Sequence, residues 1–116
     1  MNEETTRDDL VALAKDDMRA FNEVLDNLGW RKDYVPDENS GLAAFAPYTP
    51  DLKIIESYGG EGAGDEYWKI FSFKDETLRF NATWVSWDGV YTDEATIELV
   101  EPRQVMTTVY KAVEEL

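Results

Sequence analysis

Apolar residues recur every three or four positions from about Thr6 to Leu28, which predicts one amphipathic α-helix over this stretch. The apolar positions are Leu10, Leu13, Ala14, Met18, Phe21, Leu25 and Leu28. Thr6, followed three residues later by Asp9, is typical of a helix N-terminus. Gly29 follows the last apolar position, so we expect the helix to stop there.

From residue 52 the period of the apolar residues changes to two, which predicts β-strands. Four strand-like segments follow one another: Leu52 to Tyr58, Tyr67 to Phe73, Thr77 to Trp87, and Thr96 to Val100. The short sequence Lys74-Asp75-Glu76 and the dipeptide Asp88-Gly89 are typical of hairpin turns, so the segments are expected to pair as an antiparallel meander. The predicted core face of the third segment carries Leu78, Phe80, Ala82 and Trp84.

The segment after Pro102 carries two competing patterns. Its spacing is helical at Val105, Val109, Ala112 and Leu116, whereas residues 105–110 are rich in β-branched side chains. We favour a helix and keep a strand as the alternative. No repeat or long linker divides the chain, so residues 1–116 are predicted to form a single domain. The predicted fold class is α+β, with an N-terminal amphipathic helix packed on a four-stranded antiparallel β-meander and a short C-terminal element.

The composition excludes most common enzyme mechanisms. Among the 116 residues there is no histidine and no cysteine, which excludes histidine-based triads, cysteine nucleophiles, disulfides and zinc sites of the Cys/His kind. With 25 acidic residues, some pair of carboxylates will meet a catalytic spacing by chance, and no pair is marked by its sequence context. The chain is therefore expected not to be an enzyme and to take no cofactor and no metal ion.

The charge of the chain restricts its partners. The formal net charge of −14 repels the phosphates of nucleic acids and of anionic membranes, so direct binding to either is not expected. No apolar run approaches the length of a membrane-spanning helix, and the sequence Met1-Asn2-Glu3-Glu4 lacks the basic charge that begins a signal peptide. A cytoplasmic location is the resulting expectation.

Acidic residues on the predicted helix form a regular series. Asp9, Asp16 and Glu23 are spaced by seven residues, which places them on one side of a helix about 10 Å apart, with Asp26 beside them. Such a stripe has two interpretations. It either solvates an outward face, or it imitates the phosphates that a nucleic-acid-binding protein of the host recognises.

The glycine-rich stretch 59–64 joins two predicted strands and is followed by acidic residues. A phosphate-cradling loop is excluded by this context, because such loops precede a helix and bring a lysine. Three interpretations are open: a mobile acidic hairpin loop, a loop that contacts a partner, and a weak calcium site. The acidic residues concerned are Glu61, Asp65 and Glu66.

Aromatic residues are concentrated in the second and third predicted strands. Both faces of the second strand are bulky, because Trp68 alternates with Tyr67 and Phe71. One interpretation is burial on both faces, by the helix on one side and by the C-terminal segment on the other. The alternative is an exposed aromatic patch for a partner or for a second copy in a homodimer, with Tyr67 and Trp87 as anchors.

A longer pattern joins these features. The segment Tyr58-Gly59-Gly60-Glu61-Gly62-Ala63-Gly64-Asp65-Glu66-Tyr67-Trp68-Lys69-Ile70-Phe71 is followed by Ser86-Trp87-Asp88-Gly89 and by Val100-Glu101-Pro102. This pattern, over residues 52–102, resembles a group of small bacteriophage-encoded proteins. The resemblance implies expression in the cytoplasm of an infected bacterial host, where small acidic phage proteins antagonise defence or DNA-handling enzymes, and it carries over no catalytic or binding residue.

The function expected from these observations is that of a small acidic phage protein that inhibits a host defence or DNA-handling protein by binding its nucleic-acid site as a DNA mimic. The alternative is a non-enzymatic structural or accessory module that self-associates through aromatic residues. The expected partner-binding residues are Asp9, Asp16, Glu23, Asp26, Glu61, Asp65, Glu66, Tyr67 and Trp87.

Overall fold

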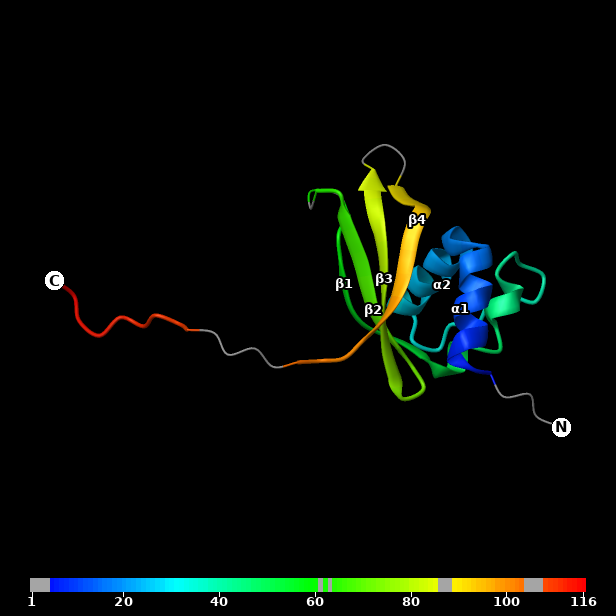
Figure 1. The fold of residues 1–116 in the computed structure, drawn as a ribbon, viewed down its shortest axis with the longest axis horizontal. Helices are drawn as coiled ribbons and strands as arrows, with labels where there is room; N and C mark the ends of the chain where they lie inside the picture. Colours follow the sequence, from blue (N-terminus) through cyan, green and yellow to red (C-terminus); the bar gives the residue numbers. More distant parts are fainter. Residues whose placement is uncertain (1–4, 61, 63, 86–88, 104–107) are drawn as a thin grey trace.

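The computed structural model describes residues 5–60, 62, 64–85, 89–103 and 108–116. Two helices, α1 (Arg7–Asp16) and α2 (Met18–Trp30), are followed by two short 3-10 helices, η1 (Ala43–Phe45) and η2 (Thr49–Asp51). The strands are β1 (Leu52–Tyr58), β2 (Glu66–Phe73), β3 (Glu76–Val85) and β4 (Gly89–Val100). They form an antiparallel sheet in the order β1-β2-β3-β4, and the helices cover one of its faces (Figure 1). The predicted α+β class is confirmed.

The prediction of a single helix over residues 6–28 is wrong, because the helix breaks at Asp17. The backbone of Asp17 has φ −156° and ψ 82°, and its Oδ1 accepts a hydrogen bond from Ala20 N at 3.1 Å. An aspartate side chain competes with the helical backbone in this way and favours a cap position. The N-terminus of α1 has its own cap, since Asp9 N donates to Thr6 Oγ1 at 3.1 Å.

The core lies between α2 and the sheet and is built around Phe21. This ring is fully buried and meets Phe71 and Phe80 edge-on, with ring centroids 5.5 and 6.0 Å apart. Phe45 of η1 packs on Phe21 with a centroid distance of 5.7 Å. The face of β3 that alternation assigned to the core is buried in it or packed against it, which confirms that prediction for Leu78, Phe80, Ala82 and Trp84.

The last strand is longer than the expected segment 96–100, because β4 begins at Gly89. The register between β4 and β3 shifts, so that residues 92–95 lie opposite a single residue of β3. Asp93 and Glu94 belong to this bulge, and a charged bulge on an edge strand opposes pairing with another sheet. The bulge also interrupts the alternation of apolar and polar positions, which is why the pattern did not reveal the first half of the strand.

The segment after β4 does not form the expected helix in the residues that the structure describes. Residues 101–103 and 108–116 adopt neither helix nor strand, and the latter extend away from the sheet (Figure 1). An isolated helix of this length is marginal in water unless its apolar face is packed. Val105 and Trp87 lie outside the described residues. No helix in the described ranges is long and apolar enough to cross a membrane.

Candidate functional site

Four polar residues, three of them buried, form a cluster where α2 crosses β2. Lys69 is 7% exposed, and its Nζ lies 2.9 Å from Oδ1 of Asp26 on α2. The same amino group donates a hydrogen bond to the hydroxyl of Tyr67. That hydroxyl lies 3.3 Å from Oδ1 of Asn22 and 3.4 Å from Oδ1 of Asp26, so its single proton has two acceptors within reach. The polar cluster, as we call these four residues, therefore ties the helix to the middle of the sheet.

The polar cluster follows from two simple periodicities. Tyr67 and Lys69 are two residues apart on a strand and share the face that the helices cover, while Asn22 and Asp26 are one helical turn apart. Burial raises the pKa of Tyr67 above its usual 10.0, although Lys69 acts in the opposite direction. The phenol is therefore neutral at physiological pH, and the charges of Lys69 and Asp26 compensate each other. The cluster holds no unpaired base or nucleophile, so its geometry serves to orient the helix on the sheet.

Lys69 was not predicted as a site residue, although the sequence contains a signal for it. It stands between Tyr67 and Phe71 in an alternating strand, at a position that should face the core. A lysine there requires a partner for its charge. The pairing also changes the interpretation of Asp26, because a carboxylate held by Lys69 is a poorer substitute for a phosphate than an unpaired one.

Three of the predicted partner-binding acids lie exposed on the helical layer. Asp9 and Asp16 are on α1, and Glu23 is on α2. Because the helix breaks at Asp17, the seven-residue spacing no longer places Glu23 in line with the other two, and the expected continuous stripe is wrong. Within the described part of the chain, the ion pairs occupy other carboxylates, those of Asp8, Asp26, Asp33, Glu66, Glu76 and Glu101.

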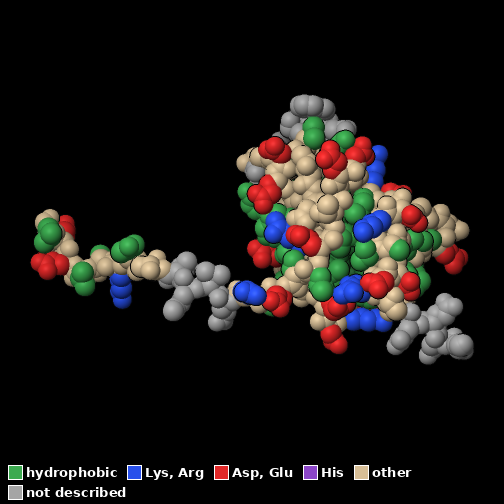
Figure 2. Space-filling view, viewed as in Figure 1, with side chains coloured by type: hydrophobic (Ala, Val, Ile, Leu, Met, Phe, Trp, Pro, Cys, Tyr) green, Lys and Arg blue, Asp and Glu red, His purple; other side chains and the backbone are tan. Residues whose placement is uncertain are grey.

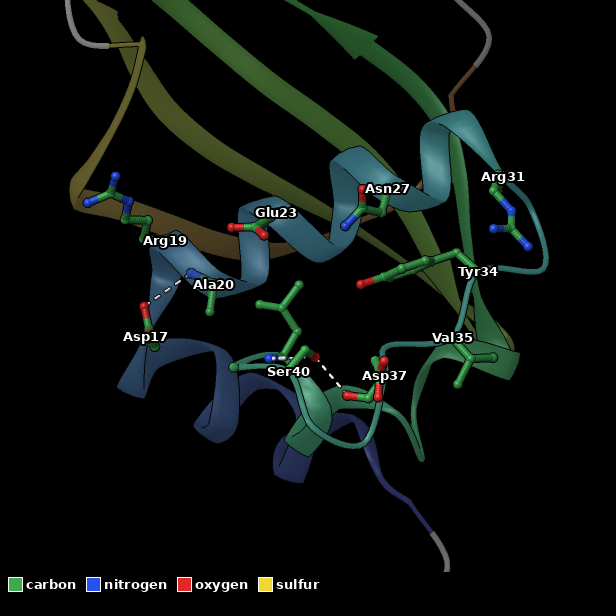
Figure 3. A pocket seen from close by; sticks show the side chains of 12 residues that line it. Asp17, Arg19, Ala20, Glu23, Asn27, Arg31, Tyr34, Val35, Asp37 and Ser40 are labelled. Atoms are coloured by element: carbon green, nitrogen blue, oxygen red, sulfur yellow. Dashed lines mark hydrogen bonds between the residues drawn. The ribbon is translucent and has the colours of Figure 1, made fainter.

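Glu23 borders a hollow of about 560 Å³ between the outer side of α2 and residues 31–42 (Figure 3). Two other carboxylates in its lining, those of Asp17 and Asp37, accept hydrogen bonds from backbone N–H groups and so stabilise the local turns. Two arginines also line the hollow. Glu23 accepts no such backbone hydrogen bond and forms no ion pair among the described residues, so its carboxylate is available to a cation from a partner.

Antiparallel pairing brings two further acidic segments to one end of the sheet. The end of β1 and the start of β2 lie at the same end of the sheet as the end of β3 and the start of β4 (Figure 1). Glu66 at the start of β2 pairs with Thr83, which pairs with Tyr91 of β4, so the starts of β2 and β4 are two strands, or about 10 Å, apart. We call the described carboxylates there, Asp65, Glu66, Asp93 and Glu94, the acidic end of the sheet.

Two carboxylates at the acidic end of the sheet, those of Glu66 and Asp93, accept hydrogen bonds from neighbouring side chains. Glu66 accepts a hydrogen bond from Trp68 Nε1 at 3.0 Å and lies 3.7 Å from Nη2 of Arg79. The hydroxyl of Tyr91 donates to Asp93, and this hydrogen bond raises the pKa of Tyr91 above 10.0.

Of the predicted partner-binding residues Glu61, Asp65 and Trp87, Asp65 is the one that the structure describes. Asp65 is exposed, and its backbone carbonyl oxygen accepts a hydrogen bond from Trp84 N at 2.8 Å. Its carboxylate forms no ion pair with the described residues. Glu61 and Trp87 lie outside the described residues. Their roles in partner binding therefore stay predictions.

Tyr67 is not an exposed anchor, because it is buried in the core and its ring stacks near Trp84. The aromatic pair on the uncovered face of the sheet is instead Tyr58 and Trp68, with centroids 5.5 Å apart and planes 17° from parallel. The guanidinium carbon of Arg79 lies 4.9 Å from the Trp68 ring centroid. This group was missed because a bulge between Ile54 and Glu56 reverses the faces of β1 and carries Tyr58 to the uncovered side.

No three acidic side chains among the described residues converge closely enough to hold a metal ion. The acidic side chains visible in Figure 2 are spread over both layers, with Lys and Arg among them. Comparisons with protein-family models, with curated proteins and with solved structures find no match to this chain. The arrangement of the charged side chains is thus the basis on which a function can be argued.

Proposed function

We propose that this chain is a non-enzymatic inhibitor that occupies the nucleic-acid site of a host defence or DNA-handling protein, presenting carboxylates in place of phosphates. The observation that carries the proposal is the set of exposed carboxylates outside the ion pairs of the described residues, on a chain of net charge −14. A charge of this size exceeds what solubility requires and opposes folding through self-repulsion. Binding to a positively charged partner would account for the excess negative charge.

Two arrays of carboxylates support the proposal. The first lies on the helical layer and consists of Asp9, Asp16 and Glu23. The second is at the acidic end of the sheet, where Asp65 and Glu94 are exposed. Facing a basic groove, such arrays accelerate encounter and give an association rate that falls as salt increases. Because two separate arrays replace one continuous stripe, the inhibitor would touch its partner through two elements rather than through one helix.

The engaged carboxylates have a supporting part in this proposal. Asp26 is paired with Lys69, and Glu66 is held by Trp68 and Arg79. We therefore expect substitutions at Asp26 and Glu66 to act mainly on the fold, and substitutions at the two arrays to act mainly on binding. The phage origin implied by the sequence resemblance stays a prediction and sets the choice of a bacterial lysate for the test.

The alternative, self-association through aromatic residues, has less support. One of its two anchors, Tyr67, is 7% exposed and is hydrogen-bonded within the polar cluster, so it cannot meet a second copy without unfolding. The other, Trp87, lies outside the described residues. The carboxylate arrays have no such obstacle, and we retain the inhibitor as the proposed function.

The test is affinity capture from bacterial lysate with elution across a salt gradient. We expect a nucleic-acid-binding protein to be retained by the wild-type chain and lost when Asp9, Asp16 and Glu23 are replaced by Lys. The control carries the same change of net charge at Glu38, Asp51 and Asp75, which are exposed and belong to neither array. Retention by the control and loss with the first variant support the proposal. Equal loss in both variants, or no salt-eluted protein, would overturn it.

A further inference from the structure

The face of the sheet opposite the helices carries a patch that no described element covers. The paired residues Tyr58 and Trp68 lie on this face, and Ile70 follows on the same side of β2. Arg79 lies over the Trp68 ring, and its Nε is buried without a hydrogen-bond partner among the described residues. A partly exposed aromatic pair beside a further apolar side chain is typical of a surface that another segment covers. Figure 1 shows the helices on the other side only.

The segment 108–116 has the pattern of a helix that lacks a packing partner. Its large apolar side chains are almost fully exposed: Val109 at 82%, Tyr110 at 93%, Val113 at 99% and Leu116 at 109%. At helical spacing these residues and Ala112 fall on one side, while Thr108, Lys111, Glu114 and Glu115 fall on the other. A soluble chain rarely leaves four large apolar side chains of one short segment in water.

The length of the connection allows this segment to reach the uncovered face. β4 ends at Val100, which pairs with Thr77 on the strand next to β2. Residue Ile70 lies about 10 Å across the strands and about 7 Å along them from Val100, as strand spacing and rise give. The eight residues between Val100 and Val109 span up to about 26 Å when extended. A helix over residues 108–116 is about 13 Å long and fits on strands of this length.

We propose that residues 108–116 of this chain fold into an amphipathic helix that docks on its own uncovered sheet face, over Trp68 and Ile70. The extended position of the segment in Figure 1 and the docked position are then two arrangements of one chain. A segment on the same chain acts at a high effective concentration. A second copy is disfavoured as the source, because two chains of net charge −14 repel each other.

A docked segment has a consequence for recognition. It would close the aromatic face to partners and leave the helical layer and the acidic end of the sheet as the accessible surfaces. This inference does not rest on the inhibitor proposal, because its test measures only the position of the segment.

Because the chain has no cysteine, a single introduced cysteine places a spin label at one position. A label at Glu115→Cys, on the polar side of the segment, is expected to weaken the amide NMR signals of Trp68 and Ile70 in the same molecule. A label at Lys15→Cys, on the helical layer, is the control and should not weaken them. A second sample mixes spin-labelled chain without isotope labelling and isotope-labelled wild-type chain without a spin label. Weakened signals in this mixture would come from a segment of another molecule.

The replacement of Val109 and Val113 by Asp should remove the weakening caused by the Glu115→Cys label. The matched pair Thr108→Asp and Lys111→Asp, on the polar side, should leave it in place. These positions lie outside the packed layers, so all variants are expected to keep the fold of the sheet and helices. Absence of weakening in the labelled chain would overturn the proposal. Weakening that occurs only between molecules in the mixture would overturn it in favour of a second copy.

Discussion

Lys69 Nζ on β2 lies 2.9 Å from Asp26 Oδ1 on α2, and this ion pair is one of the polar links between the two layers. The lysine side chain is 8% exposed, whereas the aspartate side chain is 51% exposed. The two partners therefore differ in what their removal does. Loss of the aspartate leaves a buried cation, while loss of the lysine leaves a carboxylate that water can reach.

We expect Asp26→Asn to destabilise the fold by about 2 kcal/mol, because it leaves the buried Lys69 ammonium without a compensating negative charge. Lys69→Met keeps the length of the side chain and removes its charge, so its cost should be smaller. Urea unfolding of both variants measures the difference. A larger loss for Lys69→Met than for Asp26→Asn would mean that the lysine contributes net attraction rather than a charge that needs compensation.

Tyr67 predicts a loss of stability at alkaline pH. Burial raises the pKa of its phenol above 10.0 in the folded state, so the folded protein keeps a proton that the unfolded chain releases. This contribution is intact below pH 10.0 and is lost as the pH rises from there through the folded-state pKa.

The variant Tyr67→Phe should therefore show a shallower decline of unfolding free energy between about pH 9 and 11 than the wild type. It should also lose about 1 kcal/mol at neutral pH, since the hydroxyl bonds in the polar cluster disappear. Tyr110→Phe is the control, because this side chain is 93% exposed in the folded protein. An equally steep alkaline decline in Tyr67→Phe would contradict the assignment.

The central position of Phe21 predicts a large effect of its truncation. Phe21→Ala removes a ring that is fully buried against Phe45, Phe71 and Phe80, and should cost about 3–5 kcal/mol. Such a loss is a large part of the stability of about 5–15 kcal/mol that is typical of a domain. Trp30→Ala is a matched control, because Trp30 is 88% exposed and should change stability by about 0.5 kcal/mol or less. Similar thermal midpoints for both variants would refute this description of the core.

Two adjacent glycines separate the effect of backbone strain from that of steric contact. Gly59 and Gly60 have φ of +111° and +120°, so alanine is strained at either position by about 1–3 kcal/mol. A Cβ at Gly59 would also lie 2.4 Å from the carbonyl oxygen of Glu66 and 2.8 Å from Cα of Tyr67, whereas a Cβ at Gly60 meets nothing within 4 Å. Gly59→Ala should therefore be the more destabilising in chemical denaturation. Equal costs would show that the β1–β2 pairing yields easily.

The layer architecture could be predicted from the sequence because its periodicities are strong. The alternation around Phe80 and the three- and four-residue steps around Phe21 identify the two apolar surfaces that must meet. The break at Asp17 could not be found in this way, because the apolar residues continue at helical spacing across it. Asp17 is the N-cap of α2, and the spacing of apolar residues carries no information about caps.

The candidate site was only partly predictable. Carboxylates can be identified from the sequence, but whether one is free depends on partners distant in the chain, as with Asp26 and Lys69. The bulge in β1 and the shifted register of β4 determine which side chains share a face, and neither is marked by a local motif. Tyr58 therefore lies beside Trp68, and Tyr67 is buried, for reasons that only the pairing of the strands reveals.

The central claim is that this protein and a nucleic acid compete for one site on the partner. The most direct measurement is the fluorescence anisotropy of labelled DNA bound to the captured partner, titrated with this protein. We predict full release of the DNA, with roughly tenfold more protein required when Asp9, Asp16 and Glu23 are replaced by Lys. A complex that holds the partner, the DNA and this protein together, or release that is unchanged by those substitutions, would contradict the claim.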